Sequence, residues 1–292
     1  FAADVTFADG ADIVTASAGT SNFRAGVNAG NSITSGGNYN TVVGDEAGTA
    51  ITTGDYNTAI GYSSQSSVTT AGSNVSIGAN SLRDNVTGTQ NTALGHASLL
   101  VNTASSNTAT GWLSLSANTS GANNTASGVQ ALAANTTASN CTAGGNLALY
   151  ANTTGADNTA FGKSALAANT TAANNCAFGA TSLDANTTGT QNNSFGVNSL
   201  TANTTASYNN AFGTNSLAAN TTGALNSGFG ANTLQANTTG TSNTAIGYAA
   251  LSSNTTAGAN TGVGDNALGA NTTGTMNTGI GYHALITNTT GA

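Results

Sequence analysis

A short pattern, Asn-x-small-apolar-Gly, recurs along almost the whole chain, as in residues 57–61. The glycines that end it are called reference glycines here. Each step between them is 17 residues, except one of 16 from Gly95 to Gly111 and one of 18 from Gly26 to Gly44. About sixteen copies at a fixed interval predict a solenoid, in which each copy forms one coil and stacks on the next. The other reference glycines are Gly61, Gly78, Gly128, Gly145, Gly162, Gly179, Gly196, Gly213, Gly230, Gly247, Gly264 and Gly281.

The period of 17 residues decides which solenoid this is. Helical repeats need about 30 residues or more, whereas 17 hold only short strands and turns. Asn, Thr, Ser and Gly suit turns, and proline is absent, so nothing interrupts a ladder of strands. We therefore predict an all-β fold, a parallel β-solenoid or β-roll of about sixteen coils over residues 22–292, with a separate N-terminal segment at 1–21. Coils about 4.8 Å apart give a rod of roughly 75 Å.

Two apolar columns are expected to form the core. One larger apolar residue precedes the reference glycine in most copies, and leucine follows four residues after it. Each is worth about 1.5–3 kcal/mol when buried, too little for one coil alone, so stacked neighbours must supply the rest. The first column is Ile60, Ile77, Leu94, Phe161, Phe178, Phe195, Phe212, Phe229, Ile246, Val263 and Ile280. The second is Leu82, Leu99, Leu115, Leu132, Leu149, Leu166, Leu183, Leu200, Leu217, Leu234, Leu251, Leu268 and Leu285.

A row of alanines lies two residues before the reference glycine. Because side chains alternate along a strand, we expect these alanines on the face opposite the Ile/Phe column. A flat alanine face lets another chain approach closely, which favours a homotrimer. The row is Ala59, Ala93, Ala109, Ala126, Ala160, Ala177, Ala211 and Ala245.

An asparagine column lies seven residues after the reference glycine, mostly as Asn-Thr-Thr. One interpretation is a ladder of stacked amides at a turn. The other is a glycan on each Asn-x-Ser/Thr site, a pattern that all but Asn102 satisfy. We favour the ladder, because branched sugars about 4.8 Å apart would crowd, and keep sparse glycosylation as an alternative. The column is Asn85, Asn102, Asn118, Asn135, Asn152, Asn169, Asn186, Asn203, Asn220, Asn237, Asn254, Asn271 and Asn288.

The residue directly after the reference glycine varies more than its neighbours. If this column is exposed, its aromatic rings could bind sugars, since ring faces pack on sugars. The alternative, which we favour, is that these are turn residues that pack on neighbouring chains. The candidates are Tyr62, His96, Trp112, Tyr248 and Tyr282.

Residues for catalysis or metal binding are scarce. Cys141 and Cys176 occupy different columns two coils apart, about 9–10 Å, which is too far for a disulfide, so we expect both to be free and buried. His96 and His283 lie eleven coils apart, and no spacing matches a zinc motif. We therefore predict no metal site formed by these residues.

The acidic residues are scattered and suggest no catalytic pair. Asp45 and Glu46 are adjacent, so on a strand they point to opposite faces. Asp4, Asp9 and Asp12 precede the repeats and are interpreted either as a calcium site or, preferably, as a solvated end segment. We predict no enzyme and no cofactor.

Composition excludes two classes of partner. Only 4% of residues are charged, the formal net charge is −7, and the chain has three Lys and Arg in all, so a nucleic-acid partner is not expected. No apolar run is long enough to span a membrane.

The chain starts at Phe1 without an initiator methionine, which indicates a processed or longer protein. Because the repeats run uncapped to Ala292, we expect more polypeptide or another subunit to follow, end to end.

Several stretches resemble known repeats. The sequence Asn-Thr-Val-Val-Gly-Asp-Glu-Ala-Gly-Thr-Ala at 40–50, Asn-Thr-Ala-Ile-Gly-Tyr at 57–62 and 243–248, and the Asn-Thr-Thr-Gly punctuation resemble fibre proteins of marine bacteriophages. They are also similar to the head of YadA-like trimeric autotransporter adhesins, although the 17-residue period departs from that head. The resemblance covers the chain from about residue 22 onward. It implies a trimeric, left-handed β-roll with an adhesive or spacer surface outside the cell or on a virion.

The sequence thus predicts a structural fibre shaft, in first place that of a phage tail or host-attachment fibre. The alternative is an extracellular microbial filament or surface adhesin, with or without N-glycans. An ice-binding solenoid ranks third, because the threonines alternate with Asn and Gly at a turn instead of forming Thr-x-Thr on a flat strand. The expected partners are copies of the same chain, as a trimer or an end-to-end filament, and a cell-surface glycan.

Overall fold

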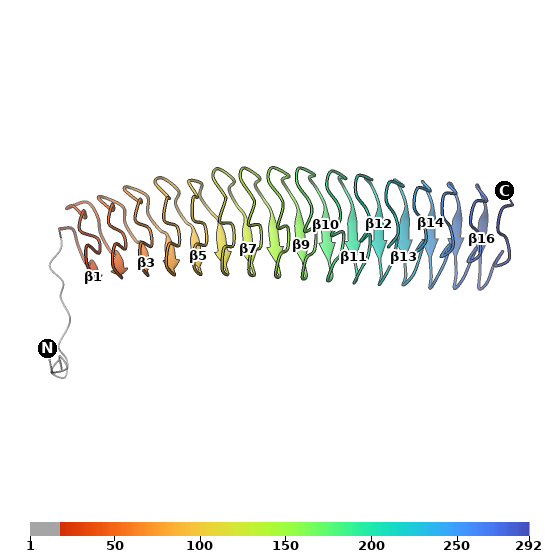
Figure 1. Ribbon diagram of the computed structural model, residues 1–292, viewed down its shortest axis with the longest axis horizontal. Coiled ribbons are helices and arrows are strands. Elements are labelled where there is room, and N and C mark those ends of the chain that lie inside the picture. Colours follow the sequence, from red (N-terminus) through yellow and green to blue (C-terminus); the bar gives the residue numbers. More distant parts are fainter. Residues whose placement is uncertain (1–17, 292) are drawn as a thin grey trace, which may run out of the picture.

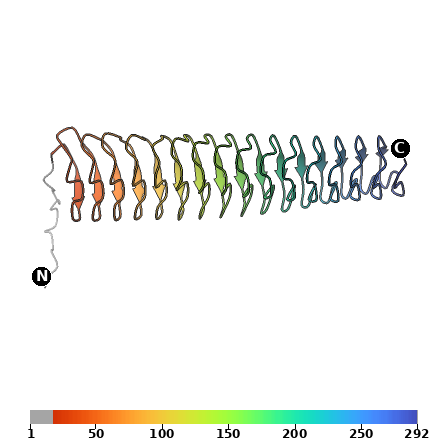
Figure 2. The same cartoon turned by 45° about the horizontal axis from the view of Figure 1, so that its top comes forward.

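The chain forms one rod of stacked coils. The computed structural model describes residues 18–291, in which sixteen strands form a single parallel sheet in chain order (Figures 1 and 2). The all-β solenoid is therefore confirmed. The strands are β1 (Phe23–Ala25), β2 (Thr41–Val43), β3 (Thr58–Ile60), β4 (Val75–Ile77), β5 (Thr92–Leu94), β6 (Thr108–Thr110), β7 (Thr125–Ser127), β8 (Thr142–Gly144), β9 (Thr159–Phe161), β10 (Cys176–Phe178), β11 (Asn193–Phe195), β12 (Asn210–Phe212), β13 (Ser227–Phe229), β14 (Thr244–Ile246), β15 (Thr261–Val263) and β16 (Thr278–Ile280).

Identical positions of successive coils lie against each other. Phe178 of β10 pairs with Phe195 of β11, for example. The 16-residue step keeps this register, since Thr92 still pairs with Thr108. The missing residue is absorbed in the turn after Asn102, whose Nδ2 donates to the carbonyl two residues on, whereas the other asparagines of that column donate three residues on.

Hydrogen bonds between coils extend well beyond the strands. In the turn after β9, the Leu166 N–H donates to the Ser182 carbonyl of the next coil at 3.0 Å, and the Ser164 N–H donates to the Asn146 carbonyl of the previous coil at 2.9 Å. Buried backbone groups need such partners. Strands of only three residues are sufficient because the turns carry ladders of their own.

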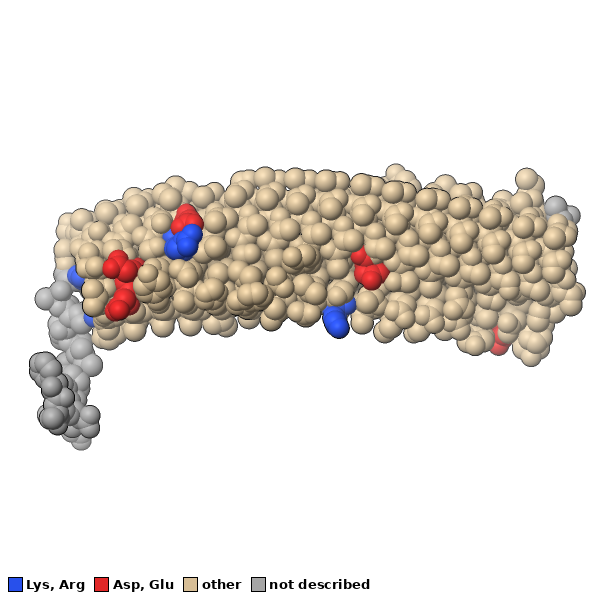
Figure 3. Space-filling view, in the orientation of Figure 1, with Lys and Arg blue, Asp and Glu red and all other residues tan. Residues whose placement is uncertain are grey.

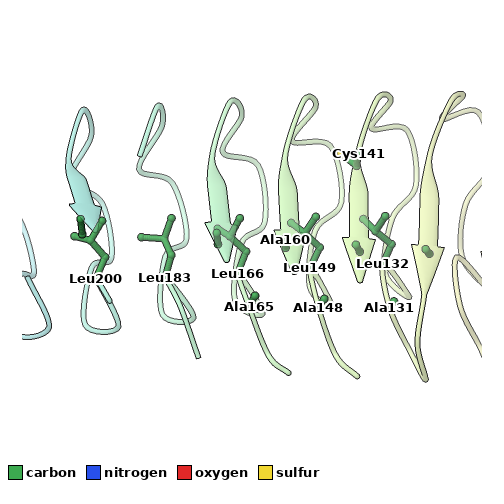
Figure 4. Close-up of a cluster of buried hydrophobic side chains, with 14 of the residues drawn as sticks. Ala131, Leu132, Cys141, Ala148, Leu149, Ala160, Ala165, Leu166, Leu183 and Leu200 are labelled. Carbon is green, nitrogen blue, oxygen red and sulfur yellow. The ribbon is translucent and has the colours of Figure 1, made fainter. Parts of the chain in front are cut away.

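The core contains the leucine column as predicted, except for Leu285 in the last coil, which is 50% exposed, and it does not contain the Ile/Phe column. Leu82 to Leu268 of the leucine column are fully buried, and Figure 4 shows Leu132 to Leu200 in one row. The facing strand contributes the alanines, which are buried as well, so the Ile/Phe side chains point outward. The predicted exposed alanine face is wrong, and the argument for a trimer that rested on it is lost.

Space inside the coil explains this inversion. At Gly228, which occupies the alanine column, a Cβ atom would lie 2.6 Å from the Ser216 Oγ and 2.7 Å from the Thr233 Oγ1. At Gly262 it would lie 3.3 Å from the Leu251 Cγ. One leucine and one small residue therefore fill the section of a coil, and the larger side chain of each strand must lie outside.

The first three coils use a different core. There the buried residues seven after the reference glycine are Ile33, Ile51 and Val68, and the position four after it is glycine in the first two coils. A Cβ at Gly48 would lie 2.8 Å from the Ile51 Cδ1, so glycine makes room for the isoleucine. The buried apolar residues accordingly form two separate clusters, one from Ala29 to Ala71 and one from Leu82 to Leu268.

Gln65 lies where the two cores meet. It occupies the leucine position and is fully buried. Its Nε2 donates to the Thr58 carbonyl and to the Ser76 Oγ, both at 2.9 Å, while its Oε1 is buried without a hydrogen-bond partner. A polar residue thus replaces the leucine in the coil that lies between the isoleucine-filled core and the leucine-filled core.

Candidate functional surfaces

The Asn-Thr-Thr column forms a buried amide ladder, called the turn Asn ladder here. From Asn118 onward, each Nδ2 donates to the Oδ1 of the asparagine one coil earlier, at 2.6 Å for Asn118 to Asn102 and 2.8 Å for Asn169 to Asn152. The same Nδ2 also donates to a carbonyl three residues on, such as Asn169 to Ala172 at 3.0 Å. The ladder continues through Asn135, Asn152, Asn186, Asn203, Asn220, Asn237, Asn254, Asn271 and Asn288.

A glycan does not fit on this ladder. Asn102 to Asn271 are fully buried, and both amide hydrogens of a typical member are already donated within the rod. Attaching a sugar to such a nitrogen would require the turn to open and would break the bond to the neighbouring coil. In the folded rod, the geometry therefore supports the ladder interpretation.

A second asparagine column lies four residues before the reference glycine, and sequence reasoning used it only as part of the repeat motif. In this strand Asn ladder, the Asn57 N–H donates to the Asn40 Oδ1 of the previous coil at 2.9 Å. The Asn57 Nδ2 donates to the Ala71 carbonyl at 3.0 Å. The Asn57 Oδ1 in turn accepts from the Asn74 N–H of the next coil at 3.2 Å, so one side chain bonds both the backbone before the next strand and the turn that leads to it. The signal was present in the sequence as an almost unbroken column of asparagine.

Cys141 interrupts the strand Asn ladder. Its N–H still donates to the Asn124 Oδ1 at 2.9 Å, and its Sγ contacts the Gly155 carbonyl at 3.3 Å, where an asparagine would place its Nδ2. Burial raises the pKa of the Cys141 thiol from its ordinary value of 9.0 to about 11. Cys176 lies half-buried in β10, where burial also raises its pKa. Both cysteines are free, but only Cys141 is fully buried.

The variable column after the reference glycine is exposed but does not form one aromatic stripe. Tyr62, Trp112, Tyr248 and Tyr282 are between 48% and 74% exposed, and His96 is exposed as well. Only His96 and Trp112 occupy adjacent coils. Tyr282 stacks on its chain neighbour His283, with ring centroids 3.8 Å apart. Between Trp112 and Tyr248 the column holds Val129, Asn146, Lys163, Ala180, Val197, Thr214 and Ala231.

The outward-pointing Ile/Phe column is the most continuous apolar feature of the surface, and we call it the outer apolar stripe. None of its residues is buried. Its longest uninterrupted run extends from β9 to β16. In that run the rings of Phe161, Phe178, Phe195, Phe212 and Phe229 stack one on the next, with centroids 4.8–5.0 Å apart and interplanar angles of 6–18°. The ring faces therefore cover each other along the rod, and ring edges point to solvent.

Charged residues are few and are used locally. Arg83 and Asp84 form an ion pair at 2.8 Å, and their hydrogen bond raises the pKa of Arg83 and lowers the pKa of Asp84. Asp45 accepts from the Val27 N–H and Glu46 from the Asn28 Nδ2, so these carboxylates do not converge. Figure 3 shows how sparse the charges are on one face.

The described coils offer no candidate metal centre. Within residues 18–291, no three His, Cys, Asp or Glu side chains lie close enough together to hold a metal ion. Asp4, Asp9 and Asp12, considered for calcium, lie outside the described residues. No helix in the described part of the chain is long and apolar enough to cross a membrane.

Comparison with known proteins finds no match. Neither a protein-family model, nor a curated protein, nor a solved structure matches this chain. The resemblance to phage-fibre and adhesin repeats therefore stays a prediction.

Proposed function

We propose that this chain is the shaft of an extracellular fibre, a stiff spacer with no enzymatic role. The observation that carries the proposal is the unbroken stack from β1 to β16, in which each strand pairs only with its neighbours in the sequence. The leucine column and both asparagine ladders run parallel to this sheet. Bending such a rod sharply would separate several ladders at once, so the arrangement favours stiffness.

The surface chemistry suits a location outside the cell. With three Lys and Arg in 292 residues, the chain offers few trypsin sites. In addition, much of the backbone is hydrogen-bonded to neighbouring coils. Its stacking relies on buried amides and leucines and not on exposed ion pairs, which salt screens. A shaft exposed to proteases and to changing salt needs these properties.

The resemblance to phage fibre repeats makes a phage tail or host-attachment fibre our first proposal for the larger assembly, on a virion. A microbial surface filament or adhesin is the second. It is favoured by exposed rings such as Tyr62 and Trp112, which are 59% and 48% exposed, because exposed aromatic rings can pack on sugars.

Ice binding remains a third candidate, and the fold shows a threonine column other than the one at the turn. A threonine column lies on the outer face of the strands, for example Thr58, Thr92 and Thr108, and not only at the turn. However, the large Ile and Phe side chains of the outer apolar stripe alternate with it. Measurable thermal hysteresis of the purified chain would favour this candidate over a shaft.

Immunogold electron microscopy tests the proposal. Antibodies raised against the purified rod would be applied to cells and virions from the source culture, with preimmune serum as the control. Labelling along thin fibres that extend from virion tails supports the phage shaft, and labelling along cell-surface filaments supports the second candidate. Labelling confined to the cell interior would contradict a fibre shaft in either form.

A further inference from the structure

The outer apolar stripe is large for the surface of a monomer. Phe161, Phe229 and Ile246 are 41–42% exposed and Ile280 is 70% exposed. A fully buried aromatic side chain covers about 150–250 Å², so a ring two-fifths exposed still presents roughly 60–100 Å². Over its whole length the stripe offers on the order of 800 Å², which is what each partner contributes to a standard protein interface. Most of this area comes from the uninterrupted run from β9 to β16, and a contiguous apolar patch of several hundred Å² marks an interaction site.

The stacking of the rings argues against a sugar as the ligand of this stripe. Sugars pack on ring faces, but the faces of Phe178, Phe195 and Phe212 are covered on both sides by neighbouring rings. The parts of these rings that reach solvent are their apolar edges. A row of such edges is suited to interdigitate with other apolar side chains.

The axial repeat identifies the partner. The stripe presents a side chain every 4.8–5.0 Å along the rod. A surface that contacts all of these side chains at once must have the same repeat over the same length. A second copy of this chain has the same repeat, because it has the same coils. No charged residue lies on the two outward-pointing positions of β2 to β16, so a second copy meets no like-charge repulsion there.

The sequence of the stripe also indicates how the two copies are arranged. Its apolar residues are interrupted in β6, β7 and β8 by Thr110, Ser127 and Gly144. When two rods lie parallel and in register, this interruption faces itself and every large apolar side chain faces another. We propose that the outer apolar stripe is a lateral interface between parallel, in-register copies of this chain. This inference goes beyond the proposed shaft function, because a shaft can also be built from a single chain.

The first test removes the rings. The full chain is compared by light scattering and sedimentation with the variant Phe178→Thr/Phe195→Thr/Phe212→Thr. The chain itself carries Thr110 in this column, so threonine is compatible with the strand. The wild type is expected to be oligomeric and the variant to dissociate with at least a tenfold higher Kd. A wild type that stays monomeric at about 100 μM would overturn the proposal.

A matched control removes three exposed rings elsewhere. Tyr39, Tyr56 and Tyr208 are 50–61% exposed and lie in another column, where φ is positive and asparagine is well tolerated. The variant Tyr39→Asn/Tyr56→Asn/Tyr208→Asn should remain as oligomeric as the wild type. If it dissociates equally, association does not depend on the stripe. Conversely, Thr110→Ile/Ser127→Ile fills the interruption and should tighten association several-fold while the sedimentation profile keeps the discrete oligomer of the wild type, which separates this gain from aggregation of misfolded chain.

Cross-linking tests the arrangement. In a Cys141→Asn/Cys176→Ser background, single cysteines are introduced as Thr110→Cys or Val263→Cys, and copper phenanthroline with oxygen serves as the oxidant that converts two thiols to a disulfide. In parallel, in-register rods both variants form covalent dimers. An antiparallel pair can place only one of these positions against itself, so cross-linking of one variant alone, or of neither, overturns the parallel arrangement.

Discussion

At the scale of single residues, the coil depends on backbone conformations that L-residues rarely adopt. Around β9, for example, Asp157, Ser164 and Leu166 have φ values of 58°, 58° and 52°. The left-handed region costs about 1–2 kcal/mol per ordinary residue, least for Gly, Asn and Asp. Each coil therefore stores some strain, which the ladders and the leucine column offset.

Thr181 is the least suited of these residues, because it is the only β-branched side chain at positive φ in the described coils. Its Oγ1 donates to the Asn198 Oδ1 at 2.6 Å, and Asn198, Asn215 and Asn232 continue the column. Thr181→Asn should relieve the strain and extend this column, raising the free energy of unfolding by about 0.5–1.5 kcal/mol in denaturant titrations. Thr181→Ser, which loses only the branch, should show part of the gain. No gain in either variant would contradict this account.

Cys141 is the second residue that departs from the pattern of its column, because it replaces an asparagine of the strand Asn ladder. In Cys141→Asn, the new Oδ1 can accept from the Asn158 N–H and the new Nδ2 can donate to the Gly155 carbonyl, bonds that a thiol makes poorly. We expect a gain of about 1 kcal/mol in unfolding free energy. Cys176→Ser, on the outer face, is the control and should change stability little.

The Cys141 thiol also gives a pH dependence with a definite sign. Its folded pKa is about 11 and its ordinary value is 9.0, so the unfolded chain loses this proton first as pH rises. Its contribution to stability is present below pH 9 and declines between pH 9 and about 11. Measured against Cys141→Asn, which lacks the thiol, wild-type stability should fall more steeply in this window. Parallel curves would show that the thiol is not buried.

At the scale of the element, the sequence was a good guide to the columns and a poor guide to which side of the strand was inside. The 17-residue period predicted the coil, its parallel sheet and the buried leucine column. Ranking side chains by hydrophobicity placed the Ile/Phe column inside, but the space available in a coil of this size admits alanine there. The turn Asn ladder was predicted from its column, but the strand Asn ladder was not, because the carbonyl and N–H groups that bond its side chains belong to the next coil. Which side of the strand is buried follows from the space inside the coil, which is seen only in the three-dimensional structure.

The junction between the two cores offers a prediction about coupling. Later coils combine leucine four after the glycine with asparagine seven after it, whereas this coil has Gln65 and Val68. Gln65→Leu alone crowds Val68, and Val68→Asn alone leaves a cavity beside Gln65. The double variant recreates the later pairing and places an amide beside Asn85. A double-mutant cycle should give a favourable coupling of about 1–3 kcal/mol, and additivity would contradict this description of the junction.

At the scale of the whole molecule, stability should be nearly independent of salt. The one ion pair in the described coils, Arg83–Asp84, has side chains about 40% exposed and is worth little. Between low salt and about 1 M NaCl, the melting temperature of the rod should change by no more than about 2 °C. A large loss of stability in salt would mean that charges, and not stacked amides and leucines, hold the rod together.

The central claim is that residues one repeat apart lie one coil apart along a straight axis, and pulsed electron-spin resonance measures this directly. Thr137, Thr205 and Thr273 are exposed in one column, four coils between successive members. They would be spin-labelled in pairs as cysteine variants in the Cys141→Asn/Cys176→Ser background and diluted into unlabelled chain. The account predicts label separations of roughly 19 Å for Thr137–Thr205 and roughly 38 Å for Thr137–Thr273. Separations that do not double, or that spread broadly, would contradict the stacked rod.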